Sequence, residues 1–314
     1  MRIVVTGGAG FIGSHVVDQL LLAGHEVSVL DDLSTGTLEN LPLDKVSFTH
    51  GSIVDREVVQ NIIAGADGVI HLAALVSVPK SIEQPLLSSA INVTGTLHVL
   101  EAARDAGIHR VTLASSAAVY GRSTQPIQRE VDPCLPVSPY GVEKLADEGY
   151  ARAFNESFQM SNVCFRFFNV FGPRQLPDHE YAAVLPKFLA SAHAGEALTI
   201  HGTGSQYRDF VFVEDVARLL VATATTGLIA EELVYNLAFG DVHSIRDIAE
   251  MALSITKSHS ELLFSEPRPG DITTSEADGN RLRRLFPSFE PTPFPSAVAK
   301  TSTWLHDVLT AKRP

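Results

Sequence analysis

The sequence predicts an α/β protein: a doubly wound parallel sheet, followed by a smaller and irregular α/β domain. Three observations lead to this prediction. Short β-branched runs alternate with helical stretches through the first half of the chain. A glycine-rich segment follows the first of these runs and opens the first helical stretch. After about residue 166 proline and glycine become denser and the alternation loosens.

Each element of the first half is expected from its own residues. Strands are predicted where β-branched residues cluster, at 3–6, 27–30, 46–49, 68–72, 110–114 and 162–166. Helices are predicted between them, near 12–23, 55–64, 84–107 and 141–158. Strands and helices that alternate at this spacing form βαβ units, and therefore a Rossmann-type sheet with helices on both faces.

The second half is expected to carry shorter helices, near 181–194, 214–225, 244–257 and 296–310, with isolated strands between them. We expect the segment at approximately 208–239 to return to the main sheet. The predicted domains are therefore 1–166 plus approximately 208–239, and approximately 167–207 plus 240–314.

Composition narrows the class of protein. The chain has 314 residues, of which 45% are hydrophobic and 19% charged, which is ordinary for a globular enzyme. A net charge of −12 argues against nucleic-acid or anionic-membrane partners, since these require clustered Lys and Arg. Cys134 and Cys164 form no CxxC pair and there is no histidine cluster, so neither a disulfide nor a metal site is expected. We expect a cytoplasmic protein without a signal peptide or transmembrane helix.

The glycine-rich segment is typical of a dinucleotide site. Gly7, Gly10 and Gly13 lie between a strand and a helix, where the backbone can approach a pyrophosphate and the helix N-terminus faces it. Asp31 ends the second strand and is placed to accept the ribose hydroxyls, which favours NAD over NADP. A tight turn at the glycines and a solvated turn at Asp31 and Asp32 are the alternatives.

The second group of interest is Ser116, at a strand end, with Tyr140 and Lys144 at the start of a helix. Residues four apart share a helix face, so the phenol and the ammonium can point into one site. The charges of Lys144 and of an oxidised nicotinamide favour the ionised phenol, which suits acid–base work. Ser116 would hold a substrate hydroxyl. A surface helix is the alternative interpretation of this spacing.

With these motifs in order, the chain resembles the extended short-chain dehydrogenase/reductase family, and within it the UDP-sugar 4-epimerases. The resemblance runs nearly end to end and is carried by the segments 7–13, 31–36, 71–74, 92–96, 115–121, 140–144, 166–175, 202–215 and 268–271. It implies that the first domain binds NAD and the second a UDP-sugar. It also implies a homodimer through the helices 84–107 and 141–158.

The resemblance implies roles for many residues. Tyr140 would be the catalytic base. Lys144 would lower the pKa of the Tyr140 phenol and bind the ribose of NAD. Ser116 would form a hydrogen bond with the substrate hydroxyl. Further NAD contacts would come from Gly7, Gly10, Phe11, Ile12, Gly13, Asp31, Asp32, Ser34, Thr35, Gly36, Ser52, Ile53, Leu72, Ala73, Ala74, Val76 and Phe167. Substrate contacts would come from Ser77, Asn169, Ala183, Val184, Lys187, Thr199, Ile200, His201, Arg208, Arg268, Asp271 and Ser275. Ordinary alternatives are an Arg208–Asp209 ion pair and a simple turn at 268–271. His71 is expected to be a hydrogen-bonded core residue.

Two residues depart from the family pattern. Ser52 stands where an Asp usually meets the adenine, and Glu143 stands before Lys144 where Ser or Thr is usual. A third position distinguishes the reactions of this family. Its dehydratases and decarboxylases carry an acidic residue where this chain has Ala118. The resemblance therefore implies redox-neutral epimerisation at C4 through a 4-keto sugar.

The size of the side chain at position 275 bears on the choice of substrate. In these epimerases a bulky side chain four positions after the Asp of the Arg-x-Gly-Asp motif favours plain hexoses, and here that position holds Ser275. We expect UDP-GlcNAc and UDP-GalNAc as substrates, with UDP-Glc and UDP-Gal as further candidates. The alternatives are a UDP-uronate 4-epimerase and a non-catalytic NAD-binding sensor on the same fold.

Overall fold

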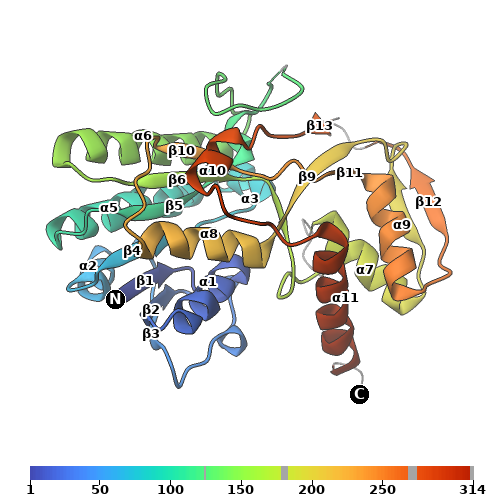
Figure 1. Cartoon of the computed structure of the whole chain (residues 1–314), viewed down its shortest axis with the longest axis horizontal. Coiled ribbons are helices and arrows are strands. Elements are labelled where there is room, and N and C mark those ends of the chain that lie inside the picture. Colours follow the sequence, from blue (N-terminus) through green and yellow to red (C-terminus); the bar gives the residue numbers. More distant parts are fainter. Residues whose placement is uncertain (124, 178–182, 268–273, 312–314) are drawn as a thin grey trace.

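The computed structural model of the chain describes residues 1–123, 125–177, 183–267 and 274–311. Figure 1 shows a larger lobe, which holds the N-terminus, and a smaller lobe built around α7, α9 and α11. Arg268 and Asp271, two of the predicted substrate residues, lie outside the described residues.

The larger lobe is built on a parallel sheet with the strand order β10-β6-β5-β4-β1-β2-β3. Every pairing between neighbours in it is parallel. This sheet confirms the predicted doubly wound class. Its strands are β1 (Arg2–Thr6), β2 (Glu26–Asp31), β3 (Ser47–His50), β4 (Gly68–His71), β5 (Val111–Ser116), β6 (Val163–Phe167) and β10 (Val234–Leu237).

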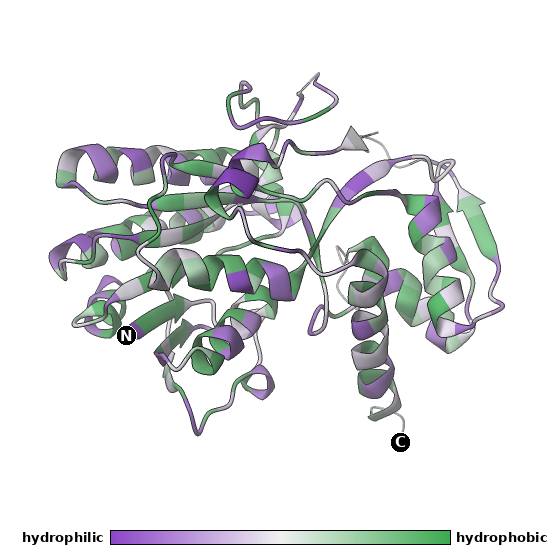
Figure 2. Ribbon diagram, viewed as in Figure 1, coloured by the Kyte–Doolittle hydropathy of each residue, from purple (hydrophilic) through white to green (hydrophobic). Residues whose placement is uncertain are grey.

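Helices cover both faces of this sheet, which is why its strands are apolar on both sides. Along β1, Ile3 and Val5 face one core cluster and Val4 faces the other, as the two-residue period of a strand requires. Figure 2 shows the strands mostly green, with purple residues on the outer turns of the helices. One face is covered by α1 (Phe11–Leu22), α8 (Val213–Thr225) and α10 (Asn280–Leu285), and the other by α2 (Arg56–Ile63), α5 (Gly95–Asp105) and α6 (Pro139–Phe158).

The smaller lobe has its own core. Phe171, Phe210 and Phe294 pack there with ring centroids 5.2–6.1 Å apart. Its helices are α7 (Val184–Ala194), α9 (Ile245–Thr256) and α11 (Phe294–Ala311). In one small sheet β9 (Tyr207–Phe212) pairs with β7 (Asn169–Phe171), β11 (Val242–Ser244) and β13 (Thr274–Ser275), and in another β8 (Leu198–His201) pairs with β12 (Leu262–Ser265).

The segment 208–239 divides between the two lobes. Its α8 packs beside α1, and β10 pairs with β6 at the edge of the main sheet. By contrast, β9 pairs with strands of the smaller lobe. The chain therefore crosses from the small lobe to the large one where β9 ends and α8 begins.

The helix expected near 84–107 is interrupted, which corrects that prediction. A short helix, α4 (Pro85–Ser89), continues through a π-helical turn at Ala90–Thr94 into α5. The helix α3 (Val78–Glu83), which was not predicted, precedes α4 and is capped by Ser77. The π-helical turn is a departure from the 3.6-residue period that hydrophobic spacing alone does not reveal.

Loops after β1, β2, β4, β5 and β6 all emerge at the carboxyl edge of the main sheet, where parallel sheets of this kind bind ligands. Over the described ranges, no helix has the combination of length and apolarity that crossing a membrane requires.

Candidate active site

The glycine loop after β1 has the shape of a phosphate cradle. Gly7 has φ +71°, and a Cβ there would lie 2.7 Å from the backbone nitrogen of Ala73. A Cβ on Gly13 would overlap the carbonyl oxygen of Gly7. A Cβ on Gly10 would instead meet only the Gly7 oxygen at 3.3 Å, so that side of the loop is open. Two glycines thus allow close packing, and the third leaves room for a ligand.

The start of α1 fits an anion. Gly10 is its N-cap and provides no side chain to bond the first N–H groups, and the first turn, which opens with Phe11 and Ile12, carries no acidic residue. Free N–H groups and the positive end of the helix dipole therefore face the open side of the loop. This arrangement suits a pyrophosphate.

Asp31 ends β2 beside this loop and is buried. Its carboxylate accepts hydrogen bonds from the backbone N–H groups of Ala9 (2.9 Å) and Leu33 (2.8 Å). Burial raises the pKa of Asp31 above its ordinary value, and the two backbone bonds oppose that shift. A carboxylate has about four acceptor positions, so Asp31 can hold the loop and still accept ribose hydroxyls.

The other predicted cofactor residues line the same edge. Asp32 accepts from the N–H of Ser34 at 2.9 Å, and Ser34 and Thr35 are exposed. A Cβ on Gly36 would lie 2.8 Å from the backbone of Ala9, so this loop packs on the glycine loop.

Two further cofactor candidates have local structural tasks. The Ser52 hydroxyl accepts from the N–H of Val54 at 3.3 Å. The side chain of Ile53 is buried and fills the space that a Cβ on Gly95 would need, so it packs against α5.

The segment after β4 is held by a directional chain of hydrogen bonds. Leu72 and Ala73 donate from their N–H groups to the Thr6 hydroxyl, which bonds Nδ1 of His71 at 2.7 Å. Nε2 of His71 lies 3.0 Å from the Thr96 hydroxyl. Since that hydroxyl donates to the Asn92 carbonyl, Nε2 must carry the ring proton.

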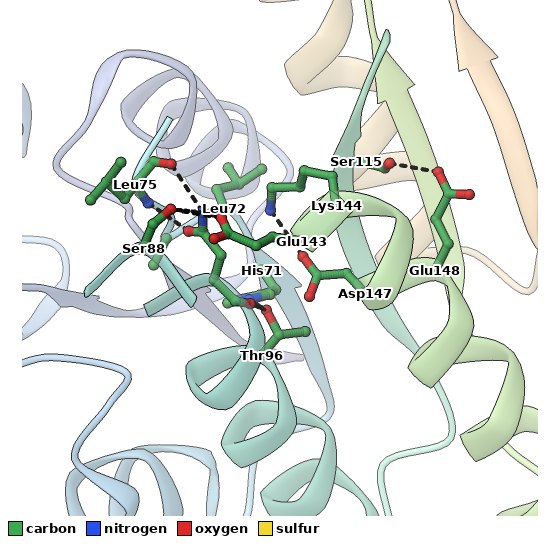
Figure 3. A network of polar contacts seen from close by, with 12 residues as sticks. His71, Leu72, Leu75, Ser88, Thr96, Ser115, Glu143, Lys144, Asp147 and Glu148 are labelled. Atoms are coloured by element: carbon green, nitrogen blue, oxygen red, sulfur yellow. Dashed lines mark hydrogen bonds and ion pairs between the residues drawn. The ribbon is translucent and has the colours of Figure 1, made fainter. Parts of the chain in front are cut away.

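His71 is therefore a neutral core residue, as predicted. Burial, and to a lesser extent the charge of Lys144, lowers its pKa to about 3. Figure 3 shows His71 beneath the α6 side chains, joined to Thr96.

The first turn of α6, which carries Tyr140, closely approaches the turn that follows Ser116. Ser138 caps α6 by accepting from the Gly141 N–H, and Pro139 occupies the first turn. A Cβ on Gly141 would lie 2.7 Å from the carbonyl oxygen of Ala118, two residues after Ser116. The first turn of α6 thus rests on the turn that follows β5.

Lys144 is buried on the same face of α6 as Tyr140, with its ammonium 3.2 Å from a carboxylate oxygen of Asp147. Burial lowers the pKa of Lys144, but Asp147 and Tyr140 raise it by more, so the ammonium stays charged. Burial raises the pKa of Asp147 to about 6, although Lys144 opposes that shift. The sequence analysis missed Asp147, although its spacing of three from Lys144 on one helix was a usable signal.

The hydroxyl of Ser115, next to Ser116, already forms a hydrogen bond with another buried side chain. Its hydroxyl donates to Glu148 at 2.6 Å, and Glu148 also forms a buried ion pair with Arg166 at 2.8 Å. The Arg166 guanidinium lies 4.6 Å from the ring centroid of Tyr120. The Ser116 hydroxyl accepts from the Ala118 N–H, and among the residues that the structure describes it donates to no other group, so it can donate to a ligand.

The smaller lobe brings three predicted substrate residues onto one sheet. Asn169 in β7 donates to the backbone oxygen of Asp209 at 2.8 Å, while Ser275 pairs with Arg208 across β13 and β9. The Arg208 guanidinium also donates to the Tyr207 carbonyl at 2.8 Å.

The remaining substrate candidates differ in what they expose. Thr199 is exposed on β8, whereas the Ile200 side chain is fully buried in the core of the smaller lobe. His201 bonds Ser265 at 2.9 Å. The partly exposed residues are Leu72, Ala73, Ala74, Ser77, Phe167, Ala183, Val184 and Lys187, and Val76 is 63% exposed.

The comparisons with known proteins agree with this geometry. The family model "NAD dependent epimerase/dehydratase family" matches residues 3–238. The UDP-glucose 4-epimerase of Mycolicibacterium smegmatis is 36% identical over 307 residues, which cover 96% of this chain and 97% of that protein. The UDP-N-acetylglucosamine 4-epimerase from Methanobrevibacter ruminantium M1, solved with UDP-N-acetylmuramic acid, has a TM-score of 0.92 at 35% identity and covers 98% of both chains.

A third comparison includes the cofactor. The Thermus thermophilus UDP-glucose 4-epimerase, solved as a complex with NAD, has a TM-score of 0.85 at 34% identity, covering 97% of this chain and 99% of that one. The chain belongs to the NAD-dependent epimerase/dehydratase family. These three relatives are UDP-sugar 4-epimerases, which are isomerases, and NAD is the cofactor that the glycine cradle of this chain fits.

The contact between α6 and β5 can be tested with one methyl group. Gly141→Ala places a Cβ 2.7 Å from the Ala118 oxygen, so we expect a loss of about 1–3 kcal/mol in unfolding free energy and a loss of activity. Urea unfolding and initial-rate assays measure these.

Gly149→Ala is the matched control on the same helix. Its Cβ would meet nothing within 4 Å, so we expect a gain of about 0.5–1 kcal/mol from the better helix former. Equal effects of the two substitutions would contradict the packing argument.

Proposed function

We propose that this protein interconverts UDP-GlcNAc and UDP-GalNAc by inverting C4, and that it also accepts UDP-Glc and UDP-Gal. One observation carries the proposal: the first turn of α6, which holds Tyr140, packs on the turn after Ser116 at the sheet edge that bears the glycine cradle, and Lys144 follows in the next turn of α6. This packing would bring a phenol, a buried ammonium and a hydroxyl together beside the cofactor.

The residues of the chain divide the acid–base work. Tyr140 accepts the proton of the sugar 4-hydroxyl and returns it after the ring has turned. Lys144, charged and buried, keeps a positive charge near Tyr140. Ser116 orients the 4-hydroxyl by a hydrogen bond. The glycine cradle and Asp31 would hold NAD, which would serve as the acceptor and then the donor of the C4 hydride.

The turn after β5 favours epimerisation over elimination. Ala118 has no carboxylate that could remove a second proton from the sugar, and its carbonyl is in contact with Gly141. With Tyr140 as the base, the proton that leaves the 4-hydroxyl is the proton that returns. This supports a reaction whose product is an isomer of the substrate.

The smaller lobe would hold the nucleotide. Arg208 is suited to bidentate contact with a diphosphate, and Asn169 lies on the neighbouring strand β7. The described part of the chain thus provides an anchor while the sugar ring turns. Arg268 and Asp271 are proposed to complete this site from the resemblance alone.

Ser275 supports the choice of N-acetylated sugars. It is a small residue in β13, paired with Arg208, and a small side chain leaves room beside the sugar 2-substituent. The relatives of this chain include both a UDP-N-acetylglucosamine 4-epimerase and UDP-glucose 4-epimerases, which is in keeping with both proposed pairs of substrates.

We also propose a homodimer. Large apolar side chains are exposed on neighbouring helices: Ile82 on α3 is 60% exposed, Leu86 on α4 87%, and Val142 on α6 54%. These helices contact one another within the protomer, so the exposed side chains can form one apolar patch.

Cys134 and Cys164 are free thiols, which suits a cytoplasmic protein.

Tyr140→Phe tests the proposed base. We expect kcat to fall by about 10²–10⁴, the usual contribution of a positioned acid–base group, while the protein still binds NAD. Tyr150→Phe, on the exposed side of the same helix, is the control and should leave kcat unchanged. An active Tyr140→Phe variant would exclude this mechanism and would indicate an alternative base.

A panel of UDP-sugars tests the substrate. We expect turnover of both the N-acetylated and the plain pairs when products are identified by NMR. Ser275→Tyr should abolish turnover of the N-acetylated pair and spare the plain pair, because the ring fills the space beside the 2-substituent. If wild type converts only UDP-Glc and UDP-Gal, or only UDP-uronates, the argument from Ser275 is wrong.

Leu86→Glu tests the dimer. Burying a charge in an apolar interface is costly, so we expect the mass in sedimentation velocity to fall from two chains to one. Leu22→Glu, at a residue 79% exposed on α1, is the matched control and should remain a dimer. A monomeric wild type would contradict the proposal.

A further inference from the structure

Glu143 is a buried carboxylate in the middle of the candidate site. It lies one residue before Lys144 and three after Tyr140 on α6, and it is 4% exposed. One of its oxygens, Oε2, accepts hydrogen bonds from the Ser88 hydroxyl at 2.7 Å and from the Asn92 amide at 2.6 Å. Both donors are uncharged, so the carboxylate is held by hydrogen bonds.

Asn92 connects Glu143 to the backbone of Leu75. It is fully buried in the π-helical turn at Ala90–Thr94. Its amide oxygen accepts from the N–H of Leu75 at 2.7 Å, and its amide nitrogen donates to the Leu75 carbonyl at 3.1 Å. Both backbone groups of Leu75 are therefore bound by one side chain.

Glu143 and Leu75 require the same orientation of that side chain. Oε2 of Glu143 and the carbonyl of Leu75 both accept from the NH₂ group of Asn92. The amide oxygen then faces the Leu75 N–H. A rotation of the amide by half a turn would place two acceptors together at Glu143 and two donors together at Leu75, which breaks both contacts.

Leu75 belongs to the segment 72–77, whose residues are the predicted neighbours of the nicotinamide and the sugar. The start of this segment is fixed by Thr6, and its middle is fixed by Asn92. Figure 3 shows Glu143 between Leu75 and Ser88 on one side and the helix of Lys144 on the other. Glu143 is thus the link between the cofactor loop and the turn that carries Tyr140.

We propose that Glu143 is a positioning residue for the reaction. It holds the Asn92 amide in the orientation that binds the backbone of Leu75. The cofactor loop, residues 72–77, is thereby kept in a fixed position relative to Tyr140. The role for catalysis rests on the proposed function. The effect on Leu75 does not, because it follows from the hydrogen bonds alone.

Glu143→Met removes the acceptor and keeps an unbranched side chain of similar length. We expect hydrogen exchange at the Leu75 amide to become about tenfold faster, the factor that one lost hydrogen bond represents. We also expect kcat to fall by about tenfold with KM for the UDP-sugar unchanged, since the loop is misplaced but the nucleotide anchors in the smaller lobe are intact.

Glu143→Gln is the conservative control. Its amide oxygen can accept from both Ser88 and Asn92, so exchange at Leu75 and kcat should both stay near wild type. If Glu143→Met does not fold, Glu143→Ser, whose hydroxyl is too short to replace the carboxylate, takes its place with the same expected result.

Wild-type exchange at Leu75 and wild-type kcat in Glu143→Met would overturn the proposal, and so would equal damage in Glu143→Gln. A wild-type protein without epimerase activity would refute the proposed function instead, and the exchange rate at Leu75 would still decide whether Glu143 orients Asn92.

Discussion

The approach of α6 to the end of β5 is the contact on which the rest of the site depends. Gly141 has no side chain, so the first turn of the helix can rest on the Ala118 carbonyl. This contact sets the relative positions of the helix that carries Tyr140 and Lys144 and of the strand end that carries Ser116. Tyr140 and Lys144 come from the helix, Ser116 comes from the strand end, and Tyr140 also donates its backbone N–H to Ser81 on α3.

Burial gives this arrangement its electrostatic character. Lys144 keeps its charge inside the protein because Asp147 lies 3.2 Å away and because Tyr140 is close. A buried ammonium without such neighbours would lose its proton, and the positive charge near Tyr140 would be lost with it. His71 lies beneath these groups and stays neutral. His71 is therefore no competitor for the acid–base role that we propose for Tyr140.

Local motifs were predictable from the sequence, and long-range partners were not. The glycine cradle, Asp31 and the Tyr140–Lys144 pair are set by spacings of a few residues, which a single sequence displays. Glu143 was visible only as a departure, because its role depends on Asn92, 51 residues away, and on a π-helical turn that breaks the helical period. The burial of the Ile200 side chain could not be predicted either, because its strand, β8, is too short to show which face enters the core.

A crystal structure with NAD and UDP-GlcNAc would show where the sugar lies relative to the proposed base. We expect the sugar O4 within about 2.6–3.2 Å of both the Tyr140 hydroxyl and the Ser116 hydroxyl, the range that proton transfer requires. A sugar bound with O4 away from both hydroxyls, or with Tyr140 facing a different sugar oxygen, would contradict this expectation.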